Sequence, residues 1–169
     1  MPNKVHERPD AIDLAADIAP GSPIFEARAF RPEFVEGAEA CRRAVLAPEE
    51  DLGLSSGLRA AIALRSAVHN KNTALIERYG ADCERHELDV AQHELARGAD
   101  PETLTGVHAA LASHTDMICL RPREARADHL QALLSAGLTV PQVIALSELL
   151  AFVNFESRIV DGLSLLETT

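Results

Sequence analysis

The C-terminal segment from Pro141 to Leu166 is long, and apolar residues occupy most of the circumference that it would have as a helix. Thr139 and Gln142 have the spacing of a capping box at its start, where proline is tolerated in the first turn. At 1.5 Å per residue, such a helix would span ~39 Å. A helix that is apolar on nearly all sides lies at the centre of a core or against another subunit. The segment therefore predicts a helical fold and a homo-oligomer formed through the long helices.

The rest of the chain carries helix start and stop signals at short intervals, such as Ser22 before Pro23 and Gly137 after an apolar-periodic segment. Apolar residues make up 47% of the chain, mainly alanine and leucine, and aromatic residues only 4%. This composition favours closely packed helices over a β-sandwich, and no segment predicts a strand. The helices predicted before the long one cover residues 10–19, 23–30, 32–47, 57–69, 73–79, 82–97, 101–120 and 128–136.

A length of 169 residues is typical of one domain. The segment 47–56 predicts a loop, because it is acidic and contains Gly53. No sharp change of composition divides the chain. We therefore predict an all-α fold in which residues 1–53 form a helical arm that packs on a core of residues 54–169.

The charge of the chain disfavours nucleic acid as a partner. Sixteen basic residues stand against 26 acidic ones, which gives a formal charge of −10. A phosphate backbone is repelled by such a surface unless a basic patch intervenes. The densest basic spot, Arg121, Arg123 and Arg126, is interrupted by Glu124 and followed by Asp128.

The sequence predicts neither a secretory signal at its start nor a membrane span. Residues 1–9 have no apolar stretch behind their charges, so they do not resemble a secretory signal. The longest strictly apolar run, Leu149 to Val153, is far shorter than the ~20 residues that span a membrane. We expect a cytoplasmic protein that does not interact with membranes.

Three cysteines, Cys41, Cys83 and Cys119, are an odd number at wide spacings. This pattern is typical of a reducing compartment and argues against a disulfide framework. We expect each to be a small buried apolar residue. For Cys41 the prediction depends on one helical stripe, formed by Phe34, Ala38, Cys41 and Val45.

Two stretches resemble the carboxymuconolactone decarboxylase and AhpD-type alkylhydroperoxidase superfamily. Residues Leu58 to Asn70 are similar to the helix that leads into the active site of that family. Residues Gly137 to Arg158 are similar to its long C-terminal helix, in which an asparagine (here Asn154) lies one turn before an arginine. With Arg121 to Glu124, the resemblance covers roughly residues 54–166. It implies an AhpD-like helical fold and, in the redox members, peroxide reduction.

The redox members carry a glutamate, a Cys-x-x-Cys motif twelve residues later, and a histidine four residues after the second cysteine. In them a thiolate is stabilised at a helix N-terminus, and the second cysteine resolves the sulfenic acid. The resemblance puts these four positions at Ala60, Asn72, Leu75 and Tyr79, and none of them matches. No other cysteine of the chain has a partner at this spacing. The chain therefore departs from the family that it resembles at the residues that do the thiol chemistry.

Other residues are candidates for a site without thiols. His69, Asn72 and Tyr79 lie where the resemblance implies a pocket, and His69 could act as a general base, as histidine side chains commonly do near neutral pH. His69 could equally be a helix-ending residue that suits the C-terminal dipole. Asn154 and Arg158 lie among apolar residues of the long helix. They predict either a structural pairing of Arg158 with a carboxylate or the binding of an acidic ligand.

A metal site is considered only at His86, Asp89 and His93, which would share a face if residues 82–97 formed one helix. The two histidines would then be about 10 Å apart along the axis, too far for one ion with bonds near 2.1 Å. We therefore expect no metal and no cofactor.

Two functions are consistent with the sequence. In the first, the chain is a peroxidase-related family member that has lost the thiol site and acts as a binding, assembly or partner subunit. In the second, it is an enzyme that uses acid/base chemistry on a small carboxylate or lactone, as the decarboxylase members of the family do. A small acidic ligand is a further expected partner.

Overall fold

A computed structural model describes residues 8–167, and within them every regular element is helical and no β-strand occurs. The all-α fold class is thereby confirmed. Residues 1–7 of the predicted arm, with most of the segment considered for a secretory signal, and residues 168–169 lie outside the described residues. The α-helices are α1 (Ala11–Ala15), α2 (Pro23–Ala29), α3 (Pro32–Leu46), α4 (Ser56–Asn70), α5 (Thr73–Glu84), α6 (Val90–Ala96), α7 (Gly106–Leu120), α8 (Ala127–Ser135) and α9 (Val140–Glu167). Two 3₁₀ turns, η1 (Pro101–Thr103) and η2 (Pro122–Glu124), flank α7.

Side-chain caps fix the starts of several helices where the sequence predicts them. The Ser22 hydroxyl accepts a hydrogen bond from the Phe25 amide at 3.2 Å at the start of α2. At the start of α9, the amide of Thr139 donates to the Gln142 side chain at 2.8 Å. These bonds satisfy donors that a helix N-terminus would leave without partners.

The prediction is wrong for the region between Thr73 and Arg97. The predicted break at Gly80 does not occur, and α5 continues to Glu84. Leu75, Tyr79 and Cys83 are buried at intervals of four residues, and their packing offsets the cost of about 1 kcal/mol for a glycine in a helix. A loop then separates α5 from α6.

α6 begins after Asp89, which forms a capping box with Gln92. The helix predicted over residues 82–97 is therefore two elements. The first helix is also shorter than predicted: α1 ends at Ala15 rather than at residue 19, and Asp17 follows with a positive φ of 57°.

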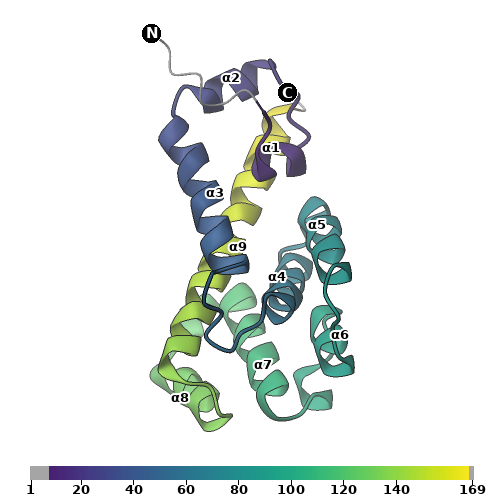
Figure 1. Cartoon of the computed structure of the whole chain (residues 1–169), viewed down its shortest axis with the longest axis vertical. Helices are drawn as coiled ribbons and strands as arrows, with labels where there is room; N and C mark the ends of the chain where they lie inside the picture. The colour runs from purple at the N-terminus through teal and green to yellow at the C-terminus, as the bar shows by residue number, and fades with distance from the viewer. Residues whose placement is uncertain (1–7, 168–169) are drawn as a thin grey trace.

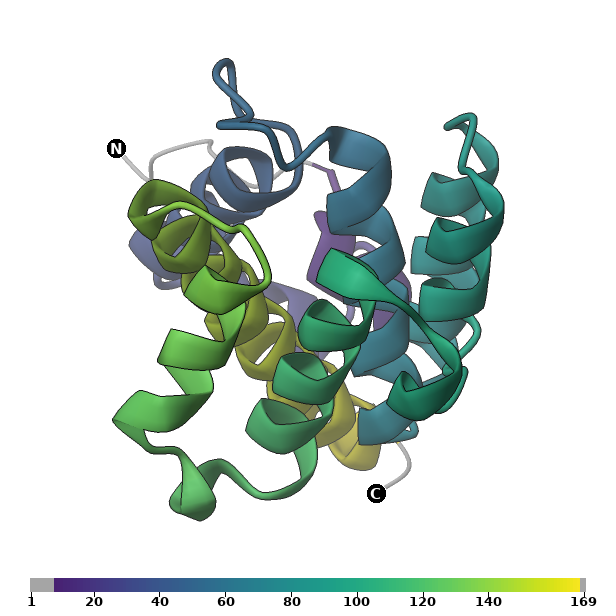
Figure 2. The same cartoon turned by 90° about the horizontal axis from the view of Figure 1, so that it is seen from below.

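Helix α4 is the centre of the fold. It packs against α5, α6, α7 and α9, as the two cartoon views show (Figures 1 and 2). Ala61, Ala63 and Ala67 of α4 are fully buried, and such small side chains allow neighbouring helices to approach closely. The loop between α3 and α4 contains the predicted boundary at residue 53.

Helix α9 runs almost the full length of the molecule, with α3 alongside one part of it and α8 at its first turns (Figure 1). One side of α9 is buried through Leu146, Leu149 and Val153. Ile144 and Phe155 on other sides are exposed. One side of α9 thus lies in the core, and other parts of its surface are exposed. That the exposed parts contact another subunit stays a prediction. No helix within the described residues is long and apolar enough to cross a membrane.

Candidate functional site

Three buried side chains from three different helices form a polar cluster inside the core. Arg42 of α3 forms an ion pair with Glu156 of α9, with Nη1 and Oε1 2.5 Å apart. The hydroxyl of Tyr79, on α5, donates a hydrogen bond to the other oxygen of Glu156, Oε2. The side chain of Glu156 is fully buried, so both of its oxygens have a partner where water has no access. We call these three residues the Tyr79 cluster.

The environment of Tyr79 favours its neutral form. Burial raises the pKa of the phenol well above its ordinary value, and the negative charge of Glu156 raises it further. The guanidinium of Arg42 lies 5.3 Å from the centre of the phenol ring. In this state Tyr79 is a hydrogen-bond donor to a carboxylate and not a base.

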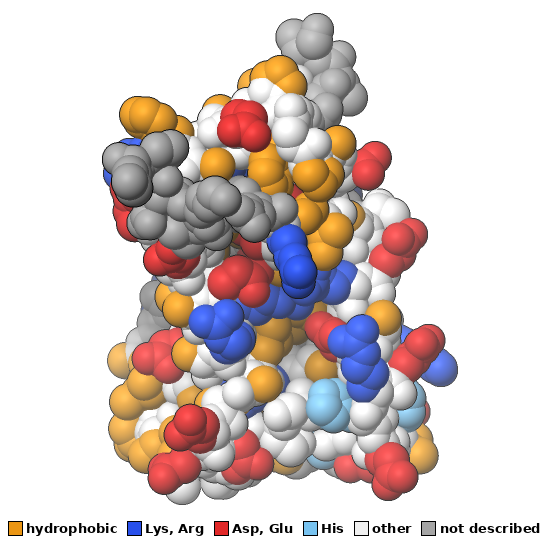
Figure 3. All heavy atoms as spheres, turned by 45° about the horizontal axis from the view of Figure 1, so that its top comes forward, with side chains coloured by type: hydrophobic (Ala, Val, Ile, Leu, Met, Phe, Trp, Pro, Cys, Tyr) orange, Lys and Arg blue, Asp and Glu red, His pale blue; other side chains and the backbone are white. Residues whose placement is uncertain are grey.

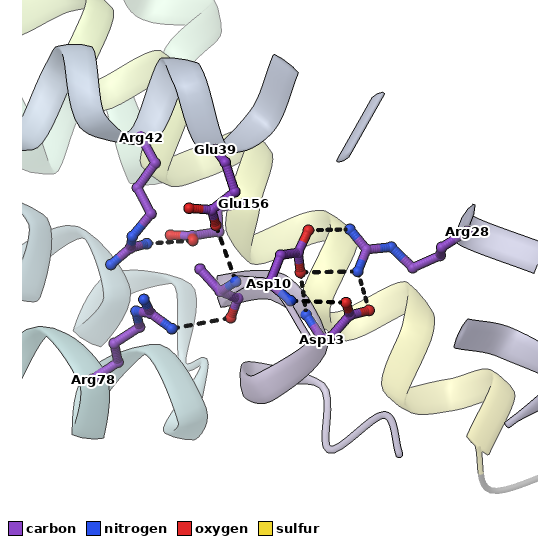
Figure 4. A network of polar contacts seen from close by, with 8 residues as sticks. Asp10, Asp13, Arg28, Glu39, Arg42, Arg78 and Glu156 are labelled. Atoms are coloured by element: carbon purple, nitrogen blue, oxygen red, sulfur yellow. Dashed lines mark hydrogen bonds and ion pairs between the residues drawn. The ribbon is translucent and has the colours of Figure 1, made fainter. Parts of the chain in front are cut away.

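The N-terminal helix α1 covers this region through hydrogen bonds of its main chain (Figure 4). The amide of Ala11 donates to Glu39 of α3 at 3.0 Å, and its carbonyl accepts from Arg78 of α5 at 3.1 Å. Arg28 of α2 holds Asp10 with two hydrogen bonds of 2.9 and 3.0 Å and also contacts Asp13. Helix α1 is therefore joined to α2, α3 and α5 at the side of the Tyr79 cluster.

A second polar cluster joins α4 to α7. The Nε and Nη2 atoms of Arg65 each donate to one oxygen of Asp116, both at 2.6 Å. The Nε2 atom of His69 lies 2.5 Å from the same carboxylate. Burial alone would raise the pKa of Asp116, but the hydrogen bonds from His69 and Arg65 hold it below its ordinary value. We call these residues the His69 cluster.

His69 is thus neither in dry core nor free in solvent. Its side chain is 19% exposed, and its Nδ1 atom has no hydrogen-bond partner among the described residues. An imidazole oriented by a carboxylate through one nitrogen can accept a proton on the other, which is the arrangement a general base requires. The base role predicted for His69 stays a prediction.

Asn72 is the N-cap of α5. Its side-chain oxygen accepts from the amide of Leu75 at 2.9 Å, and its amide nitrogen donates to Asp161 of α9 at 2.7 Å. In the structure Asn72 therefore starts one helix and connects it to another.

Asn154 is buried and Arg158 is exposed. The amide group of Asn154 contacts Asn70 at 3.2 Å and the sulfur of Cys119 at 3.7 Å. The guanidinium of Arg158 donates to the main-chain carbonyl of Asn154 at 2.9 Å. Among the side chains that the structure describes, no carboxylate forms an ion pair with Arg158. The predicted pairing of Arg158 with a carboxylate of another subunit stays a prediction.

The cysteines lie on three different helices, Cys41 on α3, Cys83 on α5 and Cys119 on α7. Burial raises the pKa of Cys83 to about 11 and also raises the pKa of Cys119. A reactive thiol needs the opposite shift, because the thiolate is the nucleophile. Cys83 and Cys119 are therefore poor candidates for redox chemistry.

The prediction that Cys41 is buried is wrong. Cys41 and Phe34 are exposed, and the side of α3 that faces the core is rotated from the predicted one. Its buried residues are Val35, Ala38, Arg42 and Val45. Arg42 can occupy this stripe because Glu156 compensates its charge.

Phe34 and Cys41, on the exposed side of α3, line an apolar groove of about 660 Å³ between α3 and α9. Phe34 at 60% exposure and Phe155 at 45% exposure stand beside small residues of both helices. We define the α3–α9 face by the residues Phe34, Gly37, Cys41, Ala44, Ala151 and Phe155. Exposed contiguous apolar surface of this kind is typical of an interaction site.

The shared helix face assumed for His86, Asp89 and His93 does not exist. His86 lies in the loop after α5, Asp89 caps α6, and only His93 is within that helix. Within the described residues, no group of three or more His, Cys, Asp or Glu side chains is arranged to hold a metal ion.

Sequence reasoning missed Arg42, Glu156, Arg65 and Asp116, which form most of both clusters. A signal was present for two of them. Glu156 is a charged residue on a helix that is apolar on nearly all sides, and Arg42 is spaced as part of a core stripe. Their pairing across 114 residues leaves no local trace in the sequence.

A comparison of the chain with protein-family models gives no match, and a search of curated proteins gives none either.

Proposed function

We propose that this chain is an AhpD-like, peroxidase-related protein without the thiol site, and that it acts as a binding and assembly subunit. The observation that carries the proposal is the exposed α3–α9 face. We further propose that the occupant of this face is a second copy of the chain. Phe34 and Phe155 project beside Gly37, Ala44 and Ala151, so a two-fold arrangement could seat each phenylalanine on the small residues of the partner.

Two observations support a family member without thiol chemistry. The position that the resemblance gives to the first redox cysteine is Asn72, which is the N-cap of α5. A helix N-terminus is where a thiolate would be stabilised, and here an amide side chain takes that position. The cysteines that the chain does have lie on three helices, and burial raises the pKa of two of them.

The oligomer is tested by placing a charge on the α3–α9 face. Phe155→Asp should weaken self-association by about 30-fold or more, because a carboxylate would replace an aromatic side chain at a buried interface, a loss of ~2 kcal/mol. Sedimentation equilibrium measures this directly. We expect the apparent mass of the wild type to exceed the monomer mass of 18.2 kDa, and the apparent mass of the variant to be closer to it.

Val90→Asp is the matched control, since Val90 is an exposed apolar residue at 75% exposure on α6, which is outside the α3–α9 face. It should leave the mass unchanged. A wild-type protein that is monomeric at high concentration would refute the homo-oligomer, and equal effects of the two substitutions would refute this face as its interface.

A second candidate function is acid/base catalysis on a small carboxylate or lactone. It is favoured by the contact of Tyr79 with Glu156 and by the contact of His69 with Asp116, which give each predicted catalytic side chain a titratable neighbour. The two functions differ in one observable. An enzyme must admit a carboxylate ligand to one of these clusters, whereas an assembly subunit need not.

We also propose that the protein acts in the cytoplasm and does not bind nucleic acid. The cytoplasm is supported by the three free cysteines, which are typical of a reducing compartment. The second part is supported by the formal charge of −10, together with the face drawn in Figure 3, where basic side chains lie beside acidic ones. A surface of this kind offers little attraction to a phosphate backbone.

A further inference from the structure

Arg78 has fewer partners than a guanidinium beneath a covering helix requires. Its Nη1 atom donates to the carbonyl of Ala11, and its buried Nε atom has no hydrogen-bond partner in the described part of the chain. A guanidinium carries five N–H donors and a full positive charge. Burial lowers the pKa of Arg78, and the nearby charge of Arg42 lowers it further. The structure therefore holds a cation that a neutral carbonyl compensates only in part.

The neighbouring carboxylates are already engaged. The two oxygens of Glu156 are taken by Arg42 and by Tyr79. Asp82 lies 3.6 Å from Arg42 and 2.6 Å from Arg85. Among the described side chains, no carboxylate forms an ion pair with Arg78. Glu156 and Asp82 attract Arg78 without a direct ion pair, so an additional negative charge would be stabilised at this position mainly by Arg78.

Helix α1 occupies the place where such a charge would lie. It is only five residues long. The main-chain hydrogen bonds of Ala11 and the ion pairs of Arg28 with Asp10 and Asp13 hold it in place (Figure 4). The carbonyl oxygen of Ala11 contacts Arg78 as the oxygen of an anion would. Charge-assisted hydrogen bonds are roughly twice as strong as neutral ones, so an anion would compete well for this position.

We propose that Arg78, with Arg42 beside it, forms a binding site for a small carboxylate or another oxyanion, and that α1 covers this site in the unliganded protein. Binding requires α1 to move away, which exposes Arg78 next to Tyr79. The site is independent of the α3–α9 face. It deepens the second candidate function by naming residues that would hold its substrate, but it is tested by binding alone and needs no turnover.

Tyr79 provides the probe, because the chain has one tyrosine and no tryptophan. Its emission reports on the hydrogen bond to Glu156 and on the exposure of the cluster. We would titrate acetate and inorganic phosphate separately, with chloride added to hold the ionic strength constant. We expect a saturable change in tyrosine emission with either anion. The anion that binds more tightly shows whether the site prefers a planar carboxylate or a tetrahedral oxyanion.

Arg28→Ala removes the ion pairs that hold α1 and leaves Arg78 unchanged. It should lower the apparent dissociation constant of the anion on the order of 10-fold, because displacing α1 then costs less free energy. Arg31→Ala is the matched control, since the exposed side chain of Arg31 pairs with Glu33 and lies over the ring of Phe34 on α3, and the substitution should leave the constant unchanged. Arg78→Gln should abolish the saturable change while far-ultraviolet circular dichroism remains that of the wild type.

Hydrogen exchange gives a second measurement that does not depend on any variant. The amides of Ala11 to Ala15 should exchange faster in the wild type when the preferred anion is present. The proposal is overturned if neither anion gives a saturable change beyond that of chloride in the wild type and in Arg28→Ala. It is also overturned if folded Arg78→Gln binds like the wild type, if Arg28→Ala behaves like Arg31→Ala, or if α1 exchange is unaffected.

Discussion

Replacing Arg42 by methionine should lower the free energy of unfolding by about 3–5 kcal/mol, because it leaves the carboxylate of Glu156 buried without its cation. The side chain of Glu156 is fully buried and that of Arg42 is 9% exposed, so water cannot replace the lost partner. Chemical denaturation at pH 7, monitored by circular dichroism, measures the loss.

Two variants separate the ion pair from other effects. Arg43→Met changes the neighbouring residue of α3, which is exposed, and should alter stability by no more than about 0.5 kcal/mol. In the double variant Arg42→Met with Glu156→Gln, a neutral amide can still accept the hydrogen bond of Tyr79, so most of the lost stability should return. An Arg42→Met variant as stable as Arg43→Met would contradict the role of the Tyr79 cluster in the core.

Replacing Arg65 by methionine should cost about 2–4 kcal/mol. Arg65 is almost completely buried and connects three parts of the fold. It donates to Asp116 of α7 and to the carbonyls of Leu95 and Ala99 near the end of α6, at 3.1 and 2.9 Å. Its loss leaves these acceptors without their donor. Arg97→Met, at an exposed position that follows α6, is the control and should be near neutral in the same denaturation experiment.

The pH dependence of stability gives a check on the same cluster. The pKa of Asp116 in the folded state lies below its ordinary value, so its contribution is fully present above about pH 4 and is lost as the pH falls through the folded value. The difference in unfolding free energy between the wild type and Asp116→Asn should therefore shrink in acid. A difference that stays constant from pH 7 to pH 3 would show that the charge of Asp116 is not what stabilises the cluster.

Much of the fold could be predicted from local signals. Ser22 before Pro23 and the pair of Thr139 with Gln142 mark helix starts in the structure, because a cap satisfies backbone donors within three residues of itself. The break predicted at Gly80 failed for the opposite reason. Whether a helix continues through a glycine depends on what its neighbours bury, and Tyr79 finds its partner Glu156 77 residues away.

Some residues of the candidate site could be predicted from the sequence, but their charged partners could not. His69, Asn72 and Tyr79 were predicted through a resemblance, and in the structure Asn72 is a helix cap. Their partners were missed because they lie on other helices and far away in the sequence. The predicted stripe of α3 contained Phe34 and Cys41 and not Arg42, so the exposed α3–α9 face was missed as well. A charge in a core stripe is a signal to look for a second buried charge of opposite sign.

Reduction of an organic hydroperoxide in the presence of a dithiol tests most directly whether the chain lacks the thiol chemistry of the redox family that its sequence resembles. The assay compares the wild type with a variant in which Cys41, Cys83 and Cys119 are all replaced by serine. We expect no turnover above the uncatalysed rate in either protein, because the cysteines lie on three helices and burial raises the pKa of two of them. Thiol-dependent turnover by the wild type that disappears in the variant would contradict this conclusion.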